Sequence, residues 1–97
     1  MRAASRLGGA ARIRRSRATF WRAGDFGVVV LGPDATEPVT LDGTGVAVWE
    51  TLAEPRSIDD LVAMLAREFG ADPAQVSADV RPLLERLDAL GVVEVTA

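Results

Sequence analysis

The apolar residues of this chain change their spacing once, from a period of two to a period of about 3.6 residues. Before residue 42, short runs rich in β-branched and aromatic residues are separated by turn residues and occupy positions 19–22, 28–31 and 37–41. After residue 42, apolar residues recur at helical spacing in three segments. We therefore predict an α+β fold, with a three-stranded antiparallel sheet followed by three helices and a short extended end at 92–95.

Capping residues set the limits of the three expected helices. The first helix follows the turn at 42–44 and ends at Pro55. Ser57 resembles the first residue of a capping box that opens the second helix, which Gly70 closes. The third helix occupies 73–90, with a proline at its first position and a glycine after its end. The sequence contains no internal repeat, so these elements predict a single domain.

The charges are divided between a basic segment and an acidic body. Residues 1–22 hold seven Arg and no acid, a charge of +7, whereas residues 23–97 hold four Arg and all fourteen acids, a charge of −10, which together give −3. We expect residues 1–11 to form a disordered basic arm and residues 12–97 to form the folded domain. Such an arm can bind nucleic acid, lipid headgroups or an acidic protein surface, or remain a solvated tail.

Four residue types that commonly carry catalysis or bind metals are absent, because the 97 residues include no Cys, His, Tyr or Lys. Asp59 and Asp60 are adjacent, so on a helix they do not face each other as paired acid and base would. The segment 43–45 lacks the Lys of a phosphate-binding loop. We therefore predict a binding protein that is not an enzyme and that uses no metal and no cofactor.

The sequence contains no targeting segment that we can identify. No apolar run follows the arginines as a secretory signal requires, and no stretch approaches the roughly 18 apolar residues of a membrane span. The absence of Cys fits a reducing compartment. We expect a soluble cytoplasmic protein without a membrane partner.

The segment 39–50, Val-Thr-Leu-Asp-Gly-Thr-Gly-Val-Ala-Val-Trp-Glu, resembles the PqqD-like family, also called the RiPP recognition element. The likeness continues through 57–61, 69–72 and 79–87, and it covers about residues 12–95 in all. Asp42 stands where the family frequently has Asn, and both residues are competent N-caps. The resemblance implies a winged-helix-like fold.

The resemblance also implies a function. Members bind the leader segment of a ribosomally synthesised precursor peptide and present it to a tailoring enzyme, which can be a radical SAM protein, a leader peptidase or another maturase. The leader adds as a strand to the third strand and lies against the third helix. The expected peptide-binding residues are Pro38, Val39, Thr40, Leu41, Val76, Val80, Arg81, Leu83, Leu84 and Leu87.

The residues of the third strand bear on this expectation independently. Proline in a sheet lies at a strand start, or on an edge with its missing donor facing outward. If Pro38 marks an edge, Thr40 directs its N–H outward as well, and an incoming strand can pair with it. If Pro38 only starts the strand, no such edge follows.

The third helix carries more apolar residues than it needs to pack along a single narrow face. Most of these residues should therefore form the core, while some of them can line a groove. Arg81 can meet acidic residues of a leader, or pair with a nearby acid such as Glu85.

A winged-helix DNA-binding protein is the alternative function. Its recognition helix should present a basic face to a groove. The candidate helix at 73–90 carries Arg81 and Arg86 against three acids, and the body is acidic. We therefore expect no specific nucleic-acid partner.

Overall fold

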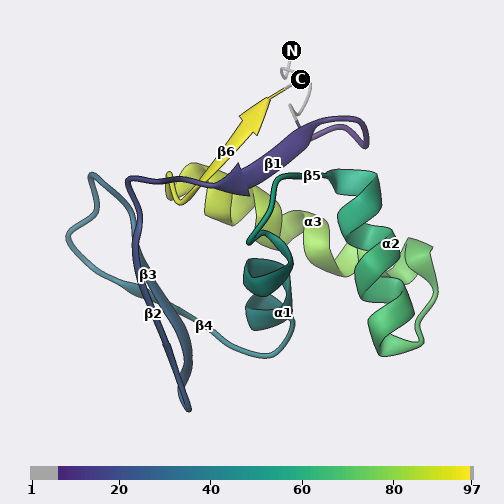
Figure 1. The fold of residues 1–97 in the computed structure, drawn as a ribbon, viewed down its shortest axis with the longest axis horizontal. Helices are drawn as coiled ribbons and strands as arrows, with labels where there is room; N and C mark the ends of the chain where they lie inside the picture. The colour runs from purple at the N-terminus through teal and green to yellow at the C-terminus, as the bar shows by residue number, and fades with distance from the viewer. Residues whose placement is uncertain (1–6, 97) are drawn as a thin grey trace.

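The computed structural model describes residues 7–96 as a mixed α+β domain with three helices and two small antiparallel sheets (Figure 1). One sheet contains, in spatial order, β2 (Phe20–Gly24), β3 (Gly27–Leu31) and β4 (Val39–Leu41). The other contains β5 (Arg56–Ser57), β1 (Arg12–Arg15) and β6 (Val93–Thr96), with β1 in the middle.

The β2–β3–β4 sheet is the meander expected from the sequence. Phe20 pairs with Leu31 at one end of the β2–β3 hairpin, and a two-residue turn connects the strands at the other. Gly27, after the turn, has φ +110°, and a Cβ there would lie 2.2 Å from the carbonyl oxygen of Leu41. Glycine is therefore required where β4 approaches the hairpin. The hairpin projects at the left of Figure 1, away from α2.

The β5–β1–β6 sheet is the part of the fold that the sequence did not predict. β1 pairs antiparallel with β6, with Arg14 opposite Glu94, and so joins segments from the two ends of the described chain. Ile13 is buried between exposed Arg12 and half-buried Arg14. A strand with three arginines in four residues has no clear apolar alternation, and its partner strand is about 80 residues away in the sequence.

The folded domain begins before residue 12, which corrects the expected limit of the arm. Leu7 and Ala11 are buried in the core. The N–H of Ile58 donates to the carbonyl oxygen of Ala11 at 3.0 Å, and the N–H of Asp59 donates to that of Gly9 at 3.1 Å. Residues 7–11 therefore pack against the start of the second helix, and positions 1–6 of the expected arm lie outside the described residues.

The helices are α1 (Thr44–Thr51), α2 (Ile58–Phe69) and α3 (Pro73–Ala89). The expected helix order is confirmed, although α1 ends four residues before Pro55. At the start of α2, the N–H of Asp60 donates to Ser57 Oγ at 3.1 Å, and at its end Gly70 has φ +61°. The three helices bury their apolar stripes in one core with the strands.

Arg15 joins the two sheets to α1. Its guanidinium carbon lies 4.7 Å from the centroid of the Trp21 ring on β2 and 4.9 Å from that of Trp49 on α1. The two rings meet edge to face at a centroid distance of 5.9 Å. Burial lowers the pKa of Arg15, and the nearby charge of Glu50 partly opposes this shift. The cation between two rings holds the β2–β3 hairpin to the rest of the domain.

Candidate functional site

The outer edge of β4 is open in the part of the chain that the structure describes. β4 is the last strand of its sheet, with β3 on one side and no strand on the other. The carbonyl oxygen of Leu41 points toward β3, because it lies beside the Cα of Gly27. Backbone direction alternates along a strand, so the N–H and C=O of Thr40 face away from β3. The edge therefore presents an unpaired donor and acceptor at Thr40, and the missing donor of Pro38 faces the same way.

The side chains of β4 divide between two faces. Val39 is half-buried and Leu41 is buried, and both lie on the face that packs against the core. Pro38 and Thr40 are exposed on the opposite face. The side chain of Leu41, one of the expected peptide-binding residues, is therefore unavailable to a ligand, whereas Pro38, Val39 and Thr40 remain accessible.

Of the five apolar α3 residues expected to bind the peptide, four lie in the core and one remains accessible. Val76, Val80, Leu84 and Leu87 are at most 5% exposed, so their side chains fill the core and do not line a groove. This corrects their expected role as side-chain contacts. Leu83 is half-buried, and so is Leu90, which lies two turns further on the same side of the helix. The accessible apolar surface of α3 is thus centred on these two leucines.

Arg81 has a structural partner that the sequence did not suggest. Its Nη1 donates to the carbonyl oxygen of Leu7 at 2.5 Å, and its Nε donates to Ser77 Oγ at 3.2 Å. The guanidinium anchors the N-terminal segment to α3. Contact with a leader would compete with these bonds.

An apolar hollow of about 220 Å³ lies on the outer face of the β2–β3–β4 sheet. It is lined by Phe20, Trp21, Arg22, Val29, Leu31 and Pro38. Phe20 is 73% exposed, and Phe26 in the hairpin turn is also exposed. Sequence reasoning missed this surface, although the continuous apolar run 28–31 was a signal, since such runs are typical of strands covered on both faces. The hollow includes Pro38, so it borders the open edge.

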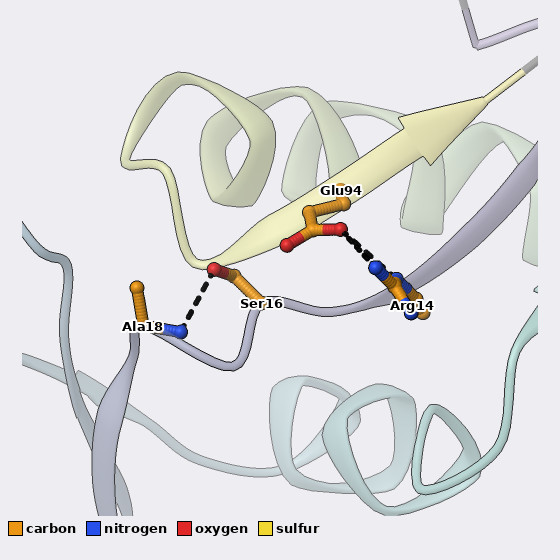
Figure 2. A network of polar contacts seen from close by, with 4 residues as sticks. All are labelled: Arg14, Ser16, Ala18 and Glu94. Atoms are coloured by element: carbon orange, nitrogen blue, oxygen red, sulfur yellow. Dashed lines mark hydrogen bonds and ion pairs between the residues drawn. The ribbon is translucent and has the colours of Figure 1, made fainter.

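A second polar cluster fixes the path from β1 to β2. Figure 2 shows the carboxylate of Glu94 facing Arg14, whose Nε and Nη2 donate to Oε1 at 2.9 and 2.6 Å. Two residues on, Ser16 Oγ accepts from the N–H of Ala18 at 3.2 Å, and the N–H of Ser16 donates to the carbonyl oxygen of Val92 at 2.9 Å. These bonds tie the turn that precedes β2 to the start of β6.

Residues 7–96 contain no group of three or more acidic, His or Cys side chains placed to hold a metal ion. Within the same residues, no helix is long and apolar enough to cross a bilayer.

Comparison with known proteins defines the class of this domain. A solution NMR structure of the PqqD truncation of Methylobacterium extorquens PqqCD matches with a TM-score of 0.73, and its title calls that protein a functional and stand-alone RiPP recognition element. The identity is 27%, and the match covers 91% of this chain and 94% of that chain. The fold is that of a RiPP recognition element, a class of binding domains that are not catalysts.

The family model of coenzyme PQQ synthesis protein D (PqqD) matches residues 27–93. The chain belongs to this family. No match was found among curated protein sequences.

Proposed function

We propose that this protein binds the leader segment of a ribosomally synthesised precursor peptide by strand addition to β4 and presents it to a modifying enzyme. The observation that carries the proposal is the open edge of β4, where the N–H and C=O of Thr40 face away from β3. An added strand pairs with these groups and extends the sheet. The family and the fold support the role of a RiPP recognition element.

Two accessible apolar surfaces are available to the side chains of an added strand. On the core side, Leu83 and Leu90 of α3 are half-buried, and the turn after β3 reaches the end of α3, since a Cβ on Gly32 would lie 2.3 Å from the carbonyl oxygen of Leu90. On the outer side, Pro38 leads to the hollow beneath Phe20. Alternate side chains of an added strand point to opposite faces, so one set would meet α3 and the other the hollow.

The affinity of such a complex comes from backbone hydrogen bonds and a few apolar anchors. β4 has three residues, so the paired segment is short and its area is well below the roughly 1,600 Å² of a standard protein interface. We expect a dissociation constant between nanomolar and micromolar, set by how well the anchors fit. Binding the leader raises the effective concentration of the substrate near an enzyme. That enzyme is a radical SAM protein, a leader peptidase or another maturase.

Replacement of Thr40 by proline tests strand addition. Because the N–H of Thr40 faces away from β3, Thr40→Pro removes a donor to the ligand without removing one from the β3–β4 ladder. We expect at least a tenfold loss of affinity for a fluorescent leader peptide, measured by anisotropy. Thr40→Val, which keeps the N–H, is the matched control and should bind as the parent does.

Circular dichroism and the melting temperature establish that both variants are folded. If folded Thr40→Pro binds the leader as tightly as Thr40→Val, the peptide does not add to this edge and the proposal fails.

The alternative of a DNA-binding protein is not favoured by the family or the fold. α3 carries two arginines against three acids, so no basic recognition face is present on it.

A further inference from the structure

Three arginines gather on the side of the molecule formed by β1 and the segment before β5. Arg12 and Arg14 share the outer face of β1, and Arg17 lies in the turn that follows. Two hollows, of about 290 and 230 Å³, lie next to each other, and Arg14 and Pro55 line both. Arg12 lines the first hollow and Arg17 the second. We call Arg12, Arg14, Arg17 and Pro55 the arginine face.

The charges of the arginine face are only partly neutralised. Arg12 is exposed, and its Nη2 donates to the carbonyl oxygen of Pro55 at 3.3 Å. Neither Arg12 nor Arg17 forms an ion pair with a carboxylate of the described residues. Arg14 is paired with Glu94, yet both side chains remain more than 40% exposed. Arg12 and Arg17 are therefore unpaired cations, one on each side of the paired Arg14.

Acids near this face limit what it can accept. Glu94 lines the first hollow, and the carboxylate of Glu54 lies 3.7 Å from the guanidinium of Arg56. The charge of Glu50 interacts favourably with that of Arg15. The rest of the body is strongly acidic. A long polyanion such as RNA would be repelled beyond the few residues of the face, whereas a short acidic segment would not. Walls formed by Pro55, Leu52 and Ala53 suit the carbon chains of Glu and Asp.

We propose that the arginine face binds a short acidic segment of the modifying enzyme, in which carboxylates pair with Arg12 and Arg17 on either side of Arg14. The identity of the partner rests on the proposed function, and the chemistry of the ligand rests on the charges described above. Arginine is suited to this task because its planar guanidinium pairs with carboxylates through two hydrogen bonds.

The arginine face and the open edge of β4 belong to different sheets (Figure 1). Exposed Asp42 directly follows β4, and exposed Glu37 lies two residues before it. An acidic segment is therefore repelled at the edge and attracted at the arginine face. A leader on β4 and an enzyme segment on β1 can be held at the same time, and this arrangement brings substrate and enzyme together.

A titration with a synthetic acidic peptide tests the ligand chemistry. The probe is a fluorescent peptide with alternating Glu and Ala, measured by anisotropy at low and high ionic strength, with its Lys counterpart and a single-stranded RNA of equal charge for comparison. We expect Arg12→Glu and Arg17→Glu each to weaken binding of the acidic peptide about fivefold or more, and added salt to weaken it in the parent. Arg67→Glu on the exposed side of α2 makes the same charge change elsewhere and should bind as the parent does.

Glu94→Gln changes the charge of the arginine face in the opposite direction. This change removes the carboxylate that pairs with Arg14, so the proposal requires that binding of the acidic peptide become tighter by about threefold. The proposal is overturned if Arg67→Glu weakens binding as much as Arg12→Glu, if Glu94→Gln has no effect, or if the RNA binds as tightly as the acidic peptide.

The same variants separate this proposal from the proposed function. Arg12→Glu and Arg17→Glu should leave leader affinity unchanged, and Thr40→Pro should leave acidic-peptide affinity unchanged. Failure of leader binding at β4 would overturn the first proposal and not the second. If Arg12→Glu weakens both ligands equally, the two sites are not separate and the arginine face is rejected as a distinct site.

Discussion

Arg15 shows how one residue of a basic segment can become structural. Residues 1–22 contain seven arginines and form one basic segment in the sequence, yet Arg15 lies between two tryptophan rings and its Nε donates to the carbonyl oxygen of Trp49 at 2.9 Å. The sequence could not reveal this, because the contact depends on β2 and α1 meeting at β1. Burial lowers the pKa of Arg15, and the ring faces compensate for lost hydration.

Arg15→Met should therefore destabilise the domain. Methionine keeps an apolar stem of similar reach but removes the cation–π contacts and leaves the Trp49 carbonyl without this donor, so we expect a loss of about 2 kcal/mol of unfolding free energy. Urea denaturation followed by tryptophan fluorescence measures the change. Arg17→Met, two residues away and exposed, is the control and should change stability by less than about 0.5 kcal/mol. Equal effects of the two substitutions would contradict the structural role of Arg15.

At the scale of elements, the sequence predicts the helices and strands that have a local periodic pattern. It does not predict the strand pairing between residues that are far apart in the chain. β2, β3 and β4, the cap at Ser57 and the end at Gly70 follow from patterns within a few residues. The extended end expected at 92–95 is β6 (Val93–Thr96), but its pairing with β1 joins residues about 80 positions apart and has no local signal. On α3 the apolar stripe predicts the helix, but spacing alone does not tell Leu83 from Leu84, because both lie on the broad apolar side and only tertiary packing decides which one is covered.

Adjacent leucines of α3 should respond differently to a charge. Leu84 is fully buried, so Leu84→Asp places a carboxylate in the core and should cost more than about 3 kcal/mol or unfold the domain. Leu83 is half-buried, so Leu83→Asp should lower the melting temperature much less and weaken leader binding at least fivefold. Thermal unfolding and leader titration of both variants measure this. A Leu83→Asp protein that is folded and binds the leader normally would exclude Leu83 from the site.

At the scale of the whole molecule, the packing of residues 7–11 against the helices is the feature that most affects stability. Residues 7–11 supply acceptors to Asp59 and Ile58 and, through Leu7, to Arg81, and β1 then joins β6. A chain that starts at residue 12, the limit suggested by composition, loses buried Leu7 and leaves these donors unpaired. We expect it to be less stable than a chain that starts at residue 7 by about 2–5 kcal/mol.

Urea unfolding of the two chains measures this difference. If the free energy of unfolding falls with urea at a similar slope in both chains, separate unfolding midpoints report a change in stability. The chain that starts at residue 12 keeps Arg12, Arg14 and Arg17, so at a urea concentration where it is still folded it should retain acidic-peptide binding. Equal midpoints would mean that residues 7–11 add nothing to the fold, and the domain would then begin at residue 12, as expected from the sequence. A shifted midpoint instead shows that a segment rich in small residues and preceded by arginine can belong to a core, because one buried leucine and three backbone acceptors outweigh the polarity around them.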